Sequence, residues 1–202
     1  MVLGILADRK RMTRRMEERL PETGHVQPLT NGDWEWSRDG GFEQGVIRVS
    51  CPSGIPGDRL WVKENFRPTG IFAMYKPRDT KACGRFSYQA DPVQLERDKT
   101  IKWRPSIFTP RWASRITLEI TNVRLERLQD ITEEDALAEG ADIDRGSAYD
   151  LAGHQGVQAH TTARGCFETL WGSIYGPDSW RSNPWVWVIE FKKLTPGCPP
   201  KP

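Results

Sequence analysis

The sequence has little of what marks a membrane protein or a zinc protein. Its 202 residues contain no apolar run near the roughly 18–20 residues that a transmembrane helix needs. The four cysteines form no CxxC pair, and the three histidines lie far from one another. Because zinc ligands usually come in close pairs, the sequence predicts no metal site and reduced thiols at Cys51, Cys83, Cys166 and Cys198.

An excess of charge of one sign is also missing. The chain has 29 Lys and Arg against 27 Asp and Glu, a net charge of +2. Composition alone therefore gives no argument for a nucleic-acid partner. Charged residues interrupt the N-terminus before any apolar stretch of useful length, so no secretory signal is expected. We expect a cytoplasmic protein with reduced cysteines and no membrane partner.

The hydrophobic pattern predicts an α+β protein with one domain. A helix over residues 162–176 is predicted by one apolar face, formed by Phe167, Leu170, Trp171, Ile174 and Tyr175, and helix is also expected at the N-terminus. Thr132 is expected to cap a short helix that Gly140 ends. The long segments 21–45, 67–100 and 141–160 read as insertions, the first as a loop or a hairpin, and 196–202 as a Pro-rich tail. Strands are predicted over 45–51, 115–128 and 183–194, with a shorter one over 84–90. A further strand is expected through Leu60 and Val62, after a Pro-Gly turn at 56–57.

The strand over 115–128 carries an irregular alternation. Ile116, Leu118 and Ile120 alternate with polar residues, and the phase then slips by one residue to Val123 and Leu125. Such a slip predicts a bulge or a sharp bend, as in a barrel strand. Together the elements fit a small mixed-sheet barrel with helices packed against it.

Three features of the sequence are candidates for chemistry. The first is DRKRMTRR, residues 8–15, where Lys10 and Thr13 stand three apart. On a helical turn that spacing places both side chains on one face. A desolvated lysine beside Arg14 and Arg15 can lose its proton and act as a base toward a hydroxyl. The alternative is a solvated basic helix end.

The second feature is Glu139, directly before the helix-ending Gly140. A carboxylate there faces the negative end of the helix dipole, at a cost of about 0.3–1 kcal/mol. An exposed glutamate with little effect on stability is the alternative explanation.

The third feature is KWRPSIFTPRWASR, residues 102–115, in which basic residues alternate with Trp103, Phe108 and Trp112. Such a segment can combine phosphate binding with base stacking, and Arg104 or Arg111 could line a cleft. The alternative is that the tryptophans are core or edge residues with Lys and Arg lying along them.

In this order the features resemble the ASCH family, a branch of the PUA-like barrels. The family's N-terminal motif is G-x-K-x-x-T-x-R, and here Asp8 stands at the Gly position while Lys10, Thr13 and Arg15 are in register. PGDRLWVKENF, RITLEITNVRLERL and WVWVIEFKKL match its barrel strands in order. The longer members that the chain resembles come from phages and prophages, which implies a bacterial or phage-infected cell. Relatives have a first strand before this motif, and the sequence predicts none here.

A bacterial subgroup of the family resembles amidohydrolases that remove acyl groups from the exocyclic amine of cytidine. The resemblance implies that Lys10, Thr13 and Glu139 are catalytic, with Lys10 as base toward Thr13 or a water. Arg15 would anchor the substrate or stabilise an oxyanion. Neither cofactor nor obligate protein partner is implied, and the partner is a nucleoside or modified base.

Two other functions stay open for the same fold. The first is an RNA-binding or modified-base-binding module without chemistry, and the second is a ribonuclease that uses Lys10 and Glu139 as acid and base. In the binding module, an aromatic side chain stacks on a base while cationic side chains hold phosphates. The candidates are Trp61 and Trp112 for stacking, and Lys10, Arg14, Arg15, Arg104 and Arg111 for phosphates.

Overall fold

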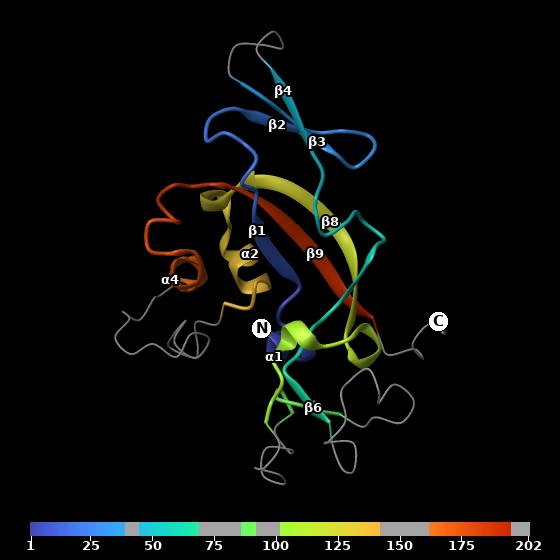
Figure 1. Cartoon of the computed structure of the whole chain (residues 1–202). Helices are drawn as coiled ribbons and strands as arrows, with labels where there is room; N and C mark the ends of the chain where they lie inside the picture. Colours follow the sequence, from blue (N-terminus) through green and yellow to red (C-terminus); the bar gives the residue numbers. More distant parts are fainter. Residues whose placement is uncertain (39–44, 69–85, 92–101, 142–161, 195–202) are drawn as a thin grey trace. The chain divides into compact units, whose positions relative to one another are not determined.

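The computed structural model describes residues 1–38, 45–68, 86–91, 102–141 and 162–194 (Figure 1). The chain folds into two compact units. The first is formed by the described residues of Leu3–Asp58 and Glu119–Lys192, and the second by those of Arg59–Leu118. The predicted segment 141–160 lies outside the described residues apart from Ala141, as does the tail 196–202.

A curled antiparallel sheet is the centre of the first unit. Strand β9 (Trp185–Leu194) lies between β1 (Met12–Met16) and β8 (Thr117–Arg127), and β1 runs antiparallel to it. Figure 1 shows β8 and β9 as two long curved strands side by side. The predicted strands over 115–128 and 183–194 are therefore confirmed. The fold is α+β, with this sheet bent toward a barrel.

Strand β9 is apolar because both faces of the sheet are covered. Its residues from Trp185 to Ile189 are all buried, which is the continuous pattern of a strand packed on two sides. Val186 and Val188 belong to a core that includes Met12 of β1 and residues of the helices. Since side chains alternate along a strand, Trp187 and Ile189 lie on the other face.

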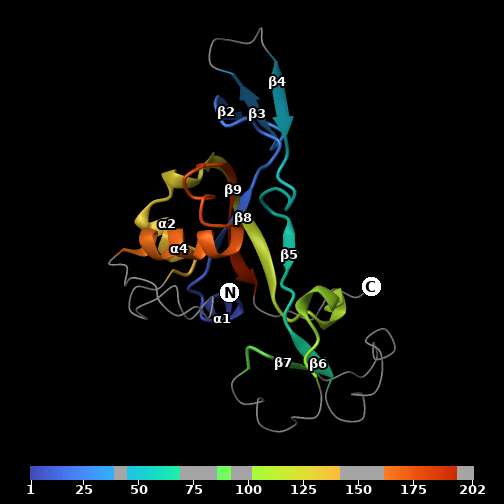
Figure 2. The same ribbon diagram turned by 60° about the vertical axis from the view of Figure 1, so that its left-hand side comes forward.

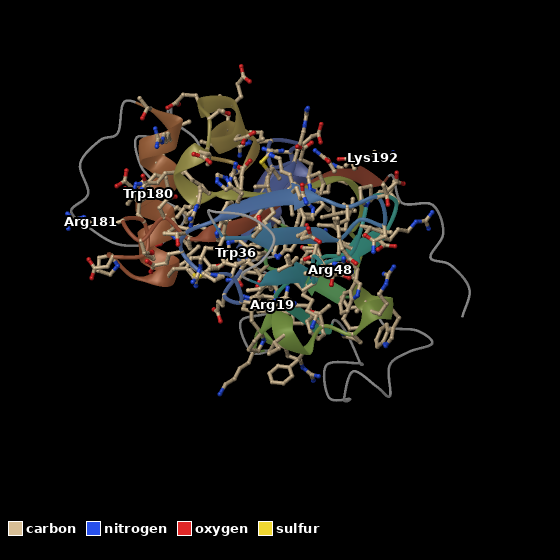
Figure 3. The ribbon with its side chains drawn as sticks, turned by 90° about the horizontal axis from the view of Figure 1, so that it is seen from above. Arg19, Trp36, Arg48, Trp180, Arg181 and Lys192 are labelled. Atoms are coloured by element: carbon tan, nitrogen blue, oxygen red, sulfur yellow. The ribbon has the colours of Figure 1, made fainter. Side chains whose placement is uncertain are left out.

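The helices cover the first of these faces. Helices α2 (Glu133–Ala138) and α4 (Ala163–Tyr175) contribute Ala136, Phe167 and Trp171 to the core (Figures 1 and 2). Trp180, labelled in Figure 3, follows α4 and packs edge-on against Phe167 at a centroid distance of 6.3 Å. The predicted apolar face of α4 is confirmed at Phe167 and Trp171 but wrong at Ile174, which is 62% exposed. None of the described helices is long and apolar enough to span a membrane.

Helix ends follow the sequence signals. The Thr132 hydroxyl accepts a hydrogen bond from the Asp135 amide at 3.1 Å and caps α2, as predicted. Gly140 ends the helix with φ of +88°, a left-handed conformation that favours glycine. Thr162 caps α4 in the same way, through the amide of Gly165.

A second antiparallel sheet in the first unit consists of β2 (His25–Pro28), β3 (Trp34–Ser37) and β4 (Val46–Val49). Of the two expectations for residues 21–45, the hairpin is therefore confirmed over its described part. Trp36, labelled in Figure 3, is only 3% exposed. Trp34 meets Trp187 edge-on, with ring centroids 6.4 Å apart, so this sheet packs on β9.

Glu17 connects the end of β1 to the same aromatic face. Its carboxylate is buried and accepts hydrogen bonds from Arg19 at 2.6 Å and from the Trp187 indole at 2.7 Å. Burial raises the pKa of Glu17, but these hydrogen bonds outweigh burial and hold the pKa below its usual range. The ionised carboxylate therefore stabilises the fold.

The second unit is built from short elements: β5 (Arg59–Trp61), β6 (Phe66–Pro68) and β7 (Phe86–Tyr88), with single 3₁₀ turns over Ser106–Phe108 and Arg111–Ala113. Strands β6 and β7 pair antiparallel (Figure 2). Phe66 is fully buried in this unit. Arg115 donates to both carboxylate oxygens of Glu64 at 2.9 Å and to Asp91 at 2.7 Å, which fixes the segment before β8.

The expectation of a helix through Lys10 and Thr13 is wrong. Helix α1 (Val2–Leu6) ends early, and Met12–Met16 pair with β9 instead. The chain turns at Asp8, whose φ is +56°. Pairing with a buried central strand outweighs the local helical preference of a charged segment.

Candidate functional site

The site begins with a buried ion pair between two residues 129 positions apart. Lys10, just before β1, donates from Nζ to Oε2 of Glu139 at 2.6 Å and to the Glu139 carbonyl at 2.7 Å. Lys10 is 9% exposed and Glu139 6%. The Arg11 amide bonds to the carbonyl of Ala138 at 2.8 Å, so the backbone fixes the same approach.

Two glycines leave room for the Lys10 side chain. A Cβ atom on Gly4 of α1 would lie 3.2 Å from Cβ of Lys10, and one on Gly140 would lie 3.4 Å from it. A contact of 3.2 Å is shorter than carbon atoms normally make, since their optimal separation is about 3.5–4.0 Å. At Gly140 it is the positive φ that favours glycine, because a Cβ there would be in ordinary van der Waals contact with Lys10.

The backbone turns at Asp8, two residues before Lys10. Its φ of +56° lies in the left-handed region, where glycine is most easily placed and Asp is among the better alternatives. The side chain also pairs with Arg11 at 2.9 Å on the surface. This turn therefore leads the chain from α1 to Lys10 and β1.

Arg14 of β1 lies behind the Lys10–Glu139 pair. Its Nη2 donates to Glu126 of β8 at 2.7 Å and to Asp135 of α2 at 2.6 Å, and Nη1 lies 3.7 Å from Oε1 of Glu139. The Arg14 side chain has no exposed surface. Its guanidinium carbon is 5.8 Å from the centroid of the Phe167 ring. Arg14 is therefore held inside the molecule.

Arg124 of β8 extends the network. It donates to Glu126 at 2.9 Å and to Asp135 at 2.7 Å, and it also pairs with Glu190 of β9. Burial lowers the pKa of Arg124, but the carboxylates of Glu126 and Asp135 outweigh burial and raise it. Glu126 belongs to β8 and Asp135 to α2, so the arginines that bond to both carboxylates hold α2 against the sheet. Helix α2 in turn positions Glu139 at its C-terminus.

Glu139 breaks the helix-dipole rule for a local reason. As the C-cap of α2 it faces the negative helix end, and Lys10 and Arg14 supply the compensating positive charge. The alternative of an exposed glutamate is excluded by its burial.

Thr13 does not join this cluster. In β1 it is opposite Ile189 of β9, and by alternation it lies on the face away from Arg14. Arg15 lies on the same side as Thr13, opposite Trp187 in register, and is exposed. The structure thus brings Lys10, Glu139 and Arg14 together. Of the two predicted anchors, Arg15 reaches the surface and Arg14 does not.

The remaining predicted binding residues belong to the second unit. Arg111 and Lys63 lie over the Trp61 ring, at 5.9 Å and 5.1 Å from its centroid. Trp112 packs against Phe86 at a centroid distance of 5.3 Å, as in the core or edge alternative.

Arg104 pairs through its backbone with Phe66, donating at 2.8 Å. In the segment 102–115, the Trp112 ring and the Arg104 backbone therefore contribute to the structure of the second unit.

Sequence reasoning missed the residues behind the pair. Arg124 and Glu126 stand two apart in β8, so alternation places both on one face. Asp135 lies in the first turn of α2, where an acidic residue is expected for helix stability alone. It also accepts hydrogen bonds from Arg14 and Arg124. Only the pairing of β1, β9 and β8 shows that these side chains meet.

The cluster pairs a group that can donate a proton, the Lys10 ammonium, with a group that can accept one, the Glu139 carboxylate. Within the described residues, no group of three His, Cys, Asp or Glu side chains is arranged to hold a metal ion. Comparison of the chain with family models, with curated proteins and with solved structures found no match. The functional argument therefore depends on the geometry and on the motif.

Proposed function

We propose that this protein is an ASCH-type amidohydrolase with a PUA-like barrel, which removes an acyl group from the exocyclic amine of a nucleobase, of the N4-acylcytidine type. The observation that carries the proposal is the 2.6 Å contact between Lys10 Nζ and Glu139 Oε2. Water is the only co-substrate of such a hydrolysis, and the family resemblance implies no cofactor.

The burial of this pair supports a functional reading. Removing two charges from water costs several kcal/mol per ion, and well-packed apolar residues often stabilise a fold as much or more. A paired acid and base inside a fold is therefore better explained by chemistry than by stability. The family resemblance supports the same conclusion, because it implies a catalytic Lys in the N-terminal motif, here Lys10, and a catalytic Glu in the helix after the central strand, here Glu139.

In the proposed mechanism Glu139 is the base and Lys10 the cationic partner. Glu139 takes a proton from a water molecule as the water oxygen adds to the acyl carbon, and the Lys10 ammonium stabilises the oxyanion that forms. When the C–N bond breaks, the departing amine receives the proton from Glu139. The products are a carboxylic acid and the free exocyclic amine. Because Thr13 lies on the other face of β1, water is the proposed nucleophile.

The test is hydrolysis of N4-acetylcytidine, followed by ultraviolet absorbance. Lys10→Met and Glu139→Gln are expected to abolish turnover, while Thr13→Ala retains it. Arg11→Gln is a matched control, because Arg11 is adjacent to Lys10 and its carboxylate partner Asp8 is exposed. If Thr13→Ala abolishes turnover while the fold is intact, the hydroxyl and not water makes the attack.

A binding module is the second candidate, favoured by one observation in the second unit. Lys63 and Arg111 near the Trp61 ring place two cations beside an aromatic face, a combination that suits a base and its phosphates. On this hypothesis the protein leaves N4-acetylcytidine intact and binds RNA with strong salt dependence. Cleavage of that RNA would instead identify a ribonuclease.

A further inference from the structure

Two buried polar atoms at the site have no hydrogen-bond partner among the described residues. They are Oε1 of Glu139 and Nε of Arg14. The other oxygen of Glu139 is bonded to Lys10, and both terminal nitrogens of Arg14 have neighbours. The unsatisfied oxygen of Glu139 faces Nη1 of Arg14, whose hydrogen-bond partner is the Met12 sulfur at 3.3 Å.

The separation of these side chains is too long for a direct bond and short enough for a bridge. Nη1 of Arg14 lies 3.7 Å from Oε1 of Glu139, beyond the roughly 3.2 Å limit of a good N–H···O bond. Unsatisfied charged groups are costly in a protein interior, and buried water is the usual partner of such groups. A water oxygen about 2.9 Å from Glu139 Oε1 and from Nη1 of Arg14 would give Oε1 the partner that it lacks.

The chemistry of the two atoms specifies the bridging group. A carboxylate oxygen only accepts and a guanidinium only donates, so the group must donate to Glu139 and accept from Arg14. Water does both. Lys10 can add a further bond, because its ammonium has three N–H donors and the two bonds to Glu139 use two of them.

We propose that Glu139 and Arg14 bind a water molecule between them, and that this water is the nucleophile of the hydrolysis. The role of this water as the nucleophile rests on the proposed function, whereas the water site itself does not. Arg14 is then a positioning residue. Glu126 and Asp135 fix its guanidinium, and the guanidinium holds the water oxygen while Glu139 accepts its proton. The oxygen bonds to the acyl carbon and the proton passes to the departing nitrogen.

The first test is a crystal structure at a resolution that shows ordered water. A water within about 3.2 Å of both Glu139 Oε1 and an Arg14 nitrogen is expected. In Arg14→Lys, which loses the guanidinium fork, this water should be absent. Arg127→Lys is the matched control, since Arg127 lies on the same strand β8 and its guanidinium donates to the Asn183 carbonyl at 3.1 Å instead of to Glu126 or Asp135. The water should remain in that variant. A direct Arg14–Glu139 bond in the wild type, with no water, overturns the proposal.

The second test is kinetic and uses the same variants. Arg14→Lys should lower kcat for N4-acetylcytidine about 100-fold with KM changed less than about 3-fold, because misplacing a reactant has effects of that size. Arg127→Lys should stay within about 3-fold of the wild type.

Two results would overturn the kinetic half. If the water is present but Arg14→Lys keeps full kcat, that water is not the nucleophile. A wild type without turnover removes the proposed function and the nucleophile together, while the crystal structure still decides whether the water site exists.

Discussion

Glu139→Gln removes the negative charge that faces Lys10 while nearly keeping the shape of the side chain. At 2.6 Å and an effective dielectric constant of about 20, the attraction of the pair is about 6 kcal/mol before desolvation is subtracted. Desolvation offsets much of this attraction, so the net value is smaller. Removing one partner leaves the other charge buried, and we expect about 3–5 kcal/mol lower stability.

A double-mutant cycle separates the pair from its surroundings. Lys10→Met and Glu139→Gln are measured singly and together by urea unfolding, followed by tryptophan fluorescence. We expect the double variant to recover at least about 2 kcal/mol relative to the sum of the single effects.

The exposed pair of Asp8 and Arg11, at 2.9 Å, is the control, and its cycle should give less than about 1 kcal/mol. A coupling for Lys10 and Glu139 no larger than this control would refute the reasoning, because the two charges would not be a buried pair.

Three further predictions concern Glu17, Cys51 and Gly4. The pKa of Glu17 is lowered in the fold, so its stabilisation is present at neutral pH and lost as pH falls through the folded pKa. Glu17→Gln should therefore be about 1–3 kcal/mol less stable at pH 7, with the difference in stability closing below about pH 4, as measured by urea unfolding followed by tryptophan fluorescence. Burial raises the pKa of the Cys51 thiol. Iodoacetamide at pH 7.5 should therefore label Cys51 in urea but not in the native protein. Labelling of Cys51 in the native protein would contradict the burial of this side chain. Gly4→Ala should change stability by less than about 1 kcal/mol, because the better helix propensity of Ala and the crowding of Lys10 oppose each other. The same variant should lower turnover about 10-fold. Unchanged turnover would show that Lys10 tolerates the added methyl group.

Elements with a strong local signal could be predicted from the sequence. Strand β9 is an unbroken apolar run, and α2 has a threonine cap at one end and Gly140 at the other. Helix α4 was predicted with its bounds, although only part of its apolar face is covered. These signals depend on neighbours in the sequence, so they do not need the tertiary structure.

The N-terminal segment could not be predicted in this way. DRKRMTRR has no apolar alternation, because Arg14 occupies an inward position that a hydrophobic residue would normally take. Its burial depends on Glu126 and Asp135, which lie more than 110 residues away in the chain. A basic segment with partners that distant resembles a solvated helix until the sheet is known. The same reason explains why Thr13 was expected beside Lys10.

The central claim is that the Lys10–Glu139 pair hydrolyses an acyl amide on a nucleobase. The most direct measurement is the initial rate of N4-acetylcytidine hydrolysis by the wild type, Glu139→Gln and Arg11→Gln, with folding of each checked by its unfolding curve. Turnover by the wild type and Arg11→Gln, and at least about 100-fold less by folded Glu139→Gln, is the predicted result. An inactive wild type, or a Glu139→Gln variant as active as Arg11→Gln, would contradict it.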